Sequence, residues 1–204
     1  MIRRLIVLFI SKNGHVDAER VTVKIFPAIE RGAMDVVNGI VVHQTDSFTK
    51  DSVFGSYSEK GANGAHFLID KNGEIYQTAS LIKKTNHVGR MQSRCIVTRK
   101  CTPVELKAAI GMSKSPVALT RHEMKKTFPD RFPSNGDSIG IELVGKAIGP
   151  EKQEVYEAVT DQQNASLKWL VAELVDTFKV SAQEIYRHPE IGRKNLTEAS
   201  TAKW

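Results

Sequence analysis

The sequence predicts an α/β fold in which a mixed central β-sheet is flanked by helices. Three observations lead to this prediction. Short apolar runs typical of strands alternate with helical patterns along the chain. Two of these runs flank an Asn-Gly turn and predict an antiparallel hairpin. A long amphipathic segment predicts a helix that packs on the sheet. With 204 residues, 41% of them hydrophobic, the chain can form one large core, and we expect a single domain over residues 1–204.

Two apolar runs in the N-terminal part predict strands. Leu5–Ile10 is interpreted as a buried strand, the first of the fold, because two arginines precede it but no small-residue cleavage site of a signal peptide follows. Val37–Thr45 predicts a second buried strand, near whose end His43 stands. The polar segment from Asp46 to Gly61 predicts a loop with a short helix. Residues 16–36 mix apolar and charged residues and give no clear assignment.

The middle of the chain contains the clearest hairpin. Ala65–Ile69 and Glu74–Gln77 flank Lys71-Asn72-Gly73, and Asn-Gly suits the positive backbone angles of a tight turn. Further along, the stretch SIGIELVG over 138–145 predicts another strand, in which apolar residues alternate with Gly140 and Glu142. These segments supply strands for the predicted sheet.

Residues 90–136 interrupt the strand pattern and predict an insertion into the domain. A helix is expected to begin there, with Thr102 as its cap and Pro103 at its first position. The same segment holds the two cysteines of the chain, Cys95 and Cys101. They can close a small disulfide loop outside the cytoplasm or remain free thiols in a reducing cytosol, whereas a metal site at this spacing is the weakest alternative.

The segment after Thr160 predicts the best-defined helix. Thr160 can cap it, and Gln163 stands three residues on, as in a capping box. Apolar residues then recur at the spacing of one buried helix face. These residues are Leu167, Leu170, Val171, Leu174, Val175 and Phe178.

The chain carries a net charge of +6 and a pI of about 9.3, which favours anionic partners. No zinc-finger spacing, aromatic–basic RNA-binding signature or basic heptad helix is present, so we expect no nucleic-acid partner. No apolar run approaches the ~18 residues of a membrane span, so no membrane partner is expected. Much of the excess positive charge comes from Lys83, Lys84, Arg90, Arg94, Arg99, Lys100, Lys125, Lys126 and Arg131.

Three polar residues lie in or directly after apolar runs. His43 follows GIVV, Glu142 lies within IGIEL, and His188 follows EIY and an arginine. Each alone has a structural interpretation, as a core histidine, a salt-bridged carboxylate or a loop histidine. Together they are two imidazoles and a carboxylate that one rim of a sheet can present. Two histidines with one further ligand hold a catalytic zinc, and a nearby carboxylate can take a proton from water.

Five motifs, in the same order, resemble the zinc-dependent N-acetylmuramoyl-L-alanine amidases, a family that includes phage lysozyme-type amidases and peptidoglycan recognition proteins. The resemblance covers roughly residues 37–89 and 137–200. It implies an amidase domain with an α/β, peptidoglycan-recognition-protein-like fold and a bound Zn2+. The motifs are GIVVHQT, GAHFLIDKNGEIYQ, NHVG, DSIGIELVG and HPEIGRK.

The resemblance also implies roles for individual residues. His43 and His188 correspond to zinc ligands, and Glu142 to the general base. Lys194, six residues after His188, corresponds to a lysine that stabilises the oxyanion. His87 matches a cleft residue that contacts substrate.

The third zinc ligand departs from the family pattern. The usual Asp or Cys position, two residues after the lysine, holds Leu196, which cannot ligate a metal. Glu198, ten residues after His188, is therefore nominated instead. Arg90, beside the cleft, is expected to help capture the carboxylates of peptidoglycan stems, and His66 is expected to be buried and structural.

The expected activity is hydrolysis of the amide between N-acetylmuramic acid and L-alanine, on peptidoglycan or a muropeptide, by zinc-activated water. The alternative is a recognition module that binds peptidoglycan without cutting it. The expected localisation is synthesis in the cytoplasm without a signal peptide and action in a periplasm or cell wall, including that of a target cell. An endolysin, a recycling enzyme and an antibacterial effector delivered by a secretion apparatus all fit. For an effector, the basic insertion could meet an immunity protein.

Overall fold

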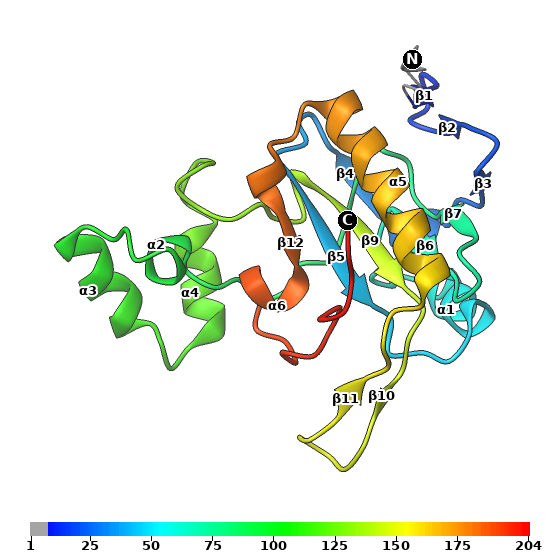
Figure 1. Cartoon of the computed structure of the whole chain (residues 1–204). Helices are drawn as coiled ribbons and strands as arrows, with labels where there is room; N and C mark the ends of the chain where they lie inside the picture. Colours follow the sequence, from blue (N-terminus) through cyan, green and yellow to red (C-terminus); the bar gives the residue numbers. More distant parts are fainter. Residues whose placement is uncertain (1–7) are drawn as a thin grey trace, which may run out of the picture.

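The computed structural model describes residues 8–204, and within them a six-stranded sheet forms the centre of the fold (Figure 1). The strand order is β12-β5-β9-β6-β7-β3. The first four strands are parallel neighbours, β6 and β7 are antiparallel, and β7 and β3 are parallel, so the sheet is mixed as predicted. The strands are β3 Val21–Val23, β5 Gly39–Gln44, β6 Phe67–Ile69, β7 Ile75–Gln77, β9 Ser138–Leu143 and β12 Ile185–Arg187.

Alternation along the strands divides the side chains between two faces of the sheet. One face packs against the long helix α5 (Asp161–Phe178), and Ile40, Val42 and Ile141 belong to this main core. On the other face, Leu68 packs with helix α1 (Lys50–Ser58). Figure 1 shows α5 lying across the sheet. Residues that alternate with the α5-facing positions must therefore point away from α5.

The predicted caps and turn are confirmed. Thr160 accepts a hydrogen bond from the backbone N–H of Gln163, and the Gln163 side chain completes the capping box of α5. Thr102 caps helix α3 in the same way. The β6–β7 hairpin turns at Gly73, whose φ of +86° is the left-handed conformation expected of the Asn-Gly sequence.

Three helices project from the sheet on one side, as Figure 1 shows in green. They are α2 (Arg94–Val97), α3 (Pro103–Gly111) and α4 (Pro116–Glu123), and we call residues 94–123 the helical arm. Cys95 and Cys101 are joined by a disulfide, which decides between the two alternatives left open by the sequence. The assignment of residues 90–136 as an insertion into an amidase domain stays a prediction.

The predicted buried strand at Leu5–Ile10 is only partly accessible to test, since residues 5–7 lie outside the described residues. In the described part the prediction of a strand is confirmed, and Leu8 is buried in the main core, but the burial predicted for Phe9 is wrong. Phe9–Ile10 form β1, which pairs with β2 (Val16–Asp17) in a separate two-stranded sheet, and Phe9 is 68% exposed. Leu8 and Ile10 pack against the main core, whereas Phe9, which lies between them, faces the opposite side.

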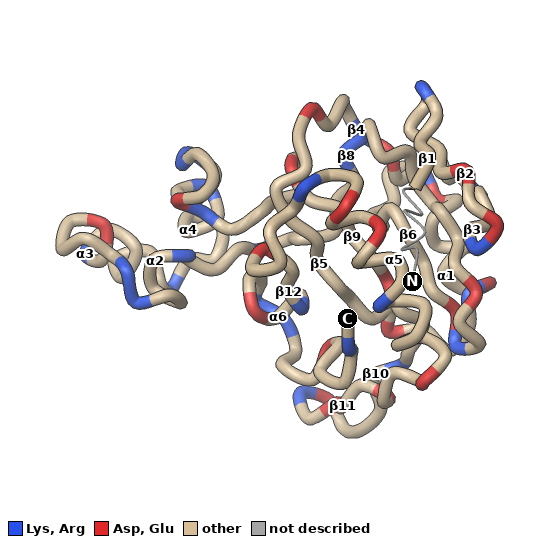
Figure 2. Tube along the Cα trace, turned by 45° about the horizontal axis from the view of Figure 1, so that its top comes forward, with Lys and Arg blue, Asp and Glu red and all other residues tan. Residues whose placement is uncertain are grey.

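The remaining elements are short. The segment without a sequence assignment, 16–36, holds β2, β3 and part of another small sheet. Residues 8–204 contain no helix that is long and apolar enough to cross a membrane. Figure 2 shows acidic and basic positions interspersed along the chain. The other elements are η1 Pro27–Ile29, β4 Glu30–Ala33, β8 Lys83–Thr85, β10 Ala147–Ile148, β11 Val155–Tyr156, η2 Ala182–Glu184 and α6 His188–Ile191.

Candidate metal centre and active site

Strand register brings three of the predicted site residues together. Arg187 of β12 lies opposite Val42 of β5, so His188, the next residue, comes level with His43. His43 in turn lies opposite Glu142 of β9. Because directly opposite residues on neighbouring strands share a face, the side chains of His43 and Glu142 lie side by side on the face away from α5. Three parallel neighbouring strands thus present one polar row.

The histidines of this row converge on Glu198. The Nδ1 atoms of His43 and His188 are 2.8 Å apart, and the Glu198 Oε1 atom lies 3.0 Å from His188 Nδ1 and 3.5 Å from His43 Nδ1. All three side chains are buried, with at most 4% exposed. Two imidazole nitrogens and a carboxylate oxygen are a usual donor set for zinc.

The outer ring nitrogens fix which atoms of these histidines carry protons. His188 Nε2 lies 2.7 Å from the Val88 carbonyl oxygen, which only accepts, so Nε2 must donate. His87 Nε2 lies 3.3 Å from the Ser138 carbonyl oxygen and must also donate, which leaves His87 Nδ1 as an acceptor for His43 Nε2 at 3.0 Å. His43, with its proton on Nε2, therefore turns an unprotonated Nδ1 toward His188 Nδ1 and the carboxylate.

A cation placed between the three ligand atoms would be attracted by the Glu198 carboxylate and by the lone pair of His43 Nδ1. Burial, and after it the charge of His188, lowers the pKa of His43 to about 4. A proton on His43 is therefore disfavoured near neutral pH. A metal ion can satisfy all three atoms, so the residues present fit a bound zinc.

The chain segment around Glu198 explains how this residue becomes the third group. Ala199 has a φ of +54°, its N–H donates to the Gln44 side chain, and its carbonyl oxygen accepts from Arg187 Nε at 3.0 Å. These bonds fix the loop so that Glu198 points inward. Leu196, at the family's usual ligand position, is 81% exposed and lies outside the cluster.

Glu142 lies in the same cavity, whose volume is about 610 Å³. Its Oε2 atom is buried and has no hydrogen-bond partner among the residues that the structure describes. Burial, and after it the charge of Glu198, raises the pKa of Glu142 to about 8, while the positive charge of Lys194 opposes the rise. Lys194 is exposed and also lines this cavity. A carboxyl group with a raised pKa beside a cluster of potential metal ligands has the properties of a general base.

The substrate-binding residues expected from the sequence are placed differently. His87 lines the cavity, but both its ring nitrogens contact protein atoms, one of them on His43. Arg90 does not line the described part of this cavity, although its neighbour Gly89 does. His66 is fully buried, with Nε2 donating to the Lys83 carbonyl oxygen, as expected of a structural histidine.

Two residues that line the cavity were not predicted as site residues from the sequence. Asn135 Oδ1 accepts from the backbone N–H groups of His87 and Val88, at 2.9 and 2.7 Å, and so fixes the segment that orients the histidines. Tyr156 of β11 also lines the cavity, and burial, followed by the charge of Glu198, raises the pKa of its phenol. Neither residue lies in a predicted strand or helix or in one of the family motifs, so the sequence did not indicate a role for them.

Comparison with known proteins identifies the family. A family model described as N-acetylmuramoyl-L-alanine amidase matches residues 33–200. No match was found among curated protein sequences.

Solved structures share the fold at low sequence identity. A selenomethionine derivative of AmpD matches with a TM-score of 0.59 and 17% identity, over 97% of this chain and 96% of that chain. AmpDh3 from Pseudomonas aeruginosa matches with a TM-score of 0.53 and 19% identity, over 81% of this chain and 56% of that chain. Another structure of AmpDh3, in complex with anhydromuramic pentapeptide, has a TM-score of 0.52 and 19% identity, over 78% and 53% of the two chains.

Proposed function

The chain belongs to the N-acetylmuramoyl-L-alanine amidase family and is such an amidase, and we propose that it cuts by means of a zinc-activated water. One observation carries the proposal: the Nδ1 atoms of His43 and His188 meet the carboxylate of Glu198 in a buried cluster, beside the unpartnered oxygen of Glu142. Two imidazole nitrogens and one carboxylate oxygen form a donor set that suits zinc. The site residues are proposed from this geometry and from the family resemblance together.

The reaction joins water to the lactyl carbonyl carbon of muramic acid and breaks its bond to the nitrogen of L-alanine. Zinc, when bound, supplies a Lewis acid that lowers the pKa of water and polarises the carbonyl. Glu142 accepts the proton of the attacking water and delivers it to the leaving amine. Lys194 brings a positive charge toward the oxygen on which negative charge develops. Thus the chain's residues move the proton and stabilise the charge.

His87 supports this chemistry from behind the metal ligands. By accepting a hydrogen bond from His43 Nε2, it holds His43 in the tautomer whose Nδ1 can bind a metal ion. We propose this positioning role for His87, in addition to the substrate contact that the family resemblance implies. Arg90, outside the lining of the cavity, can act only on parts of the substrate that extend beyond it.

The test compares zinc content and release of stem peptide from sacculi for the wild type and Glu142→Gln. Zinc in both proteins, with cutting by the wild type alone, is the expected result. Binding of sacculi without zinc and without cutting, by the wild type, would instead identify the recognition module that the sequence left as an alternative.

The disulfide supports a proposal on where the enzyme works. Cys95 and Cys101 are bonded, and such bonds persist in oxidising compartments such as a periplasm. Action on the cell wall, as an endolysin or as a delivered antibacterial effector, agrees with this feature better than cytosolic recycling does. An immunity protein as partner of the basic arm stays a prediction.

A further inference from the structure

A second, larger cavity lies next to the catalytic one. Its volume is about 750 Å³, and it runs between the helical arm and the segment from α6 to Leu196. Part of its wall is exposed aliphatic surface: Ile96 is 39%, Val97 45% and Leu196 81% exposed. We call this cavity the arm groove. Its deeper apolar wall consists of Ala109, Leu119 and Pro189.

The arm groove continues the catalytic cavity. Lys194 lines both cavities. The short helix α6 separates them, with His188 facing the catalytic cavity while Pro189 and Gly192 line the groove. A ligand whose scissile bond lies at Lys194 can therefore extend directly into the groove.

Contacts between the arm and the core form the groove without a ligand. The Gln92 side chain donates to the carbonyl oxygens of Pro189 and Gly192, at 2.8 and 3.2 Å. At the far end, an Arg193 guanidinium N–H donates to the Ser113 carbonyl oxygen. These bonds tie α6 and the turn after it to Gln92, just before the arm, and to Ser113, between α3 and α4, so the groove is a built feature of the fold.

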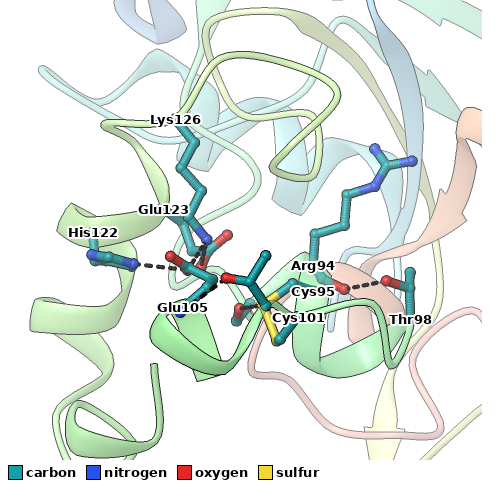
Figure 3. Close-up of a disulfide and its surroundings, with 10 residues drawn as sticks. Arg94, Cys95, Thr98, Cys101, Glu105, His122, Glu123 and Lys126 are labelled. Carbon is teal, nitrogen blue, oxygen red and sulfur yellow. Dashed lines mark hydrogen bonds and ion pairs between the residues drawn. A yellow bond between two sulfur atoms is a disulfide. The ribbon is translucent and has the colours of Figure 1, made fainter. Parts of the chain in front are cut away.

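Within the arm, covalent and ionic links hold the groove wall in place, as Figure 3 shows. The Cys95–Cys101 disulfide joins α2 to the start of α3. Lys126 bonds Glu105 of α3 and Glu123 of α4. Arm residues that line the groove, such as Val97 and Ala109, therefore belong to linked helices.

The chemistry of the wall favours a peptide over a glycan. Glycan hydroxyls need hydrogen-bond partners, which the aliphatic part of the wall, such as Ile96, Val97 and Leu196, does not provide. No aromatic side chain lines the groove within the part of the chain that the structure describes. Small side chains such as the methyl group of alanine suit this wall. The exposed cations Arg193 and Lys194 at its edge complement the free carboxylates of a stem peptide.

We infer that the arm groove binds the distal residues of the stem peptide, so that the enzyme prefers substrates with long stems. This inference rests on the proposed function, because it places the scissile amide at Lys194. The arm then makes the enzyme selective for stem length, and the catalytic cavity alone does not provide this selectivity. Its contribution should reside in binding of the long substrate and leave the chemical step unchanged.

The experiment measures kcat and KM on muramic acid fragments that carry a two-residue or a five-residue stem. Wild type, Ile96→Asp, Val97→Asp and the control Val104→Asp are compared. Val104 is 81% exposed on the same arm and is not a groove residue, so its variant carries the same new charge elsewhere. All three positions are exposed, and the variants should fold.

The wild type should cleave the long-stem fragment with kcat/KM about tenfold higher than the short-stem fragment, through KM. Ile96→Asp and Val97→Asp should lose this preference and retain wild-type kcat on the short stem, whereas Val104→Asp should keep it. Equal kcat/KM for both lengths in the wild type would overturn the inference, as would an unchanged preference in the two groove variants. Failure to cleave either fragment would overturn the proposed function. Calorimetric binding to Glu142→Gln would then still test the groove, where equal affinity for both stems contradicts it.

Discussion

Two clusters of histidine and glutamate in this molecule have similar potential ligand atoms, but only one of them is paired with a lysine of residues 8–204. His43, His188 and Glu198 in the core, and Glu105, His122 and Glu123 in the arm, each bring three potential ligand atoms within 4.8 Å of one another. In the arm, Lys126 Nζ bonds both carboxylates, at 2.7 Å from Glu123 Oε1 (Figure 3). Among the ion pairs of residues 8–204, none joins a lysine or arginine to Glu198.

The difference teaches that proximity of ligand atoms does not by itself make a metal site. In the arm the chain supplies its own cation, and the cluster links two helices. In the core no lysine or arginine of residues 8–204 is paired with Glu198, and the two histidines and the carboxylate form a donor set that a metal ion from outside the chain can fill. The two clusters should therefore respond to substitution in opposite ways, in activity for the core and in stability for the arm.

The largest contrast should come from the carboxylates. Glu142→Gln should lower the rate of peptide release by about 10²–10⁴-fold, because the proton of water loses its acceptor. The isosteric change keeps the shape of the cavity, so zinc content should stay unchanged. Glu105→Gln in the arm is the matched control and should retain full activity on a short-stem fragment. Comparable losses in the two variants would refute the division between the clusters.

Lys126→Met should destabilise the arm by about 2 kcal/mol, because Glu123 is fully buried and would keep an unpaired charge. Lys126 is itself partly exposed, which keeps the effect below that of a fully buried pair. Limited proteolysis within residues 94–123, compared with Lys126→Arg, measures the change. Unaltered protection of the arm in Lys126→Met would show that the cluster does not hold α3 to α4.

His87→Phe should weaken zinc binding by about 10–100-fold, since His43 would lose the acceptor that fixes its tautomer. Competition with a chromogenic chelator gives the affinity. His87→Gln, which retains an acceptor, should recover part of the loss. If both variants bind zinc as tightly as the wild type, His87 does not position His43.

The smallest expected effect is a gradual change of kcat/KM with pH. Burial raises the pKa of Glu142 above its ordinary value of 4.5, to about 8 in the protein without a bound metal, and a nearby cation should lower it again. The base form is the deprotonated one, so kcat/KM should rise with pH through an apparent pKa between these values. This limb should vanish from the residual activity of Glu142→Gln. A limb that persists there would belong to another group.

The row of His43, Glu142 and His188 could be predicted from the sequence because each lies in or directly after an apolar strand segment. Parallel register then brings the three together. The choice of Glu198 over its neighbours depends on one turn with a left-handed Ala199, which no local pattern announces.

Other features depend on contacts between distant segments. The bond of His87 to His43 spans 44 positions, and Gln92 reaches Pro189 across 97. The arm groove exists only through such contacts, so no local sequence pattern indicates it. The apolar run that ends at Ile10 misled only about Phe9, because a continuous apolar run does not say which of its side chains will be covered.

The most direct test of this account is the zinc content, by elemental analysis, of the wild type, Glu198→Ala and Glu105→Ala. We predict one zinc per chain in the wild type and in Glu105→Ala, and none in Glu198→Ala. Zinc retained by Glu198→Ala, or lost from Glu105→Ala, would contradict the assignment of the metal to the core cluster.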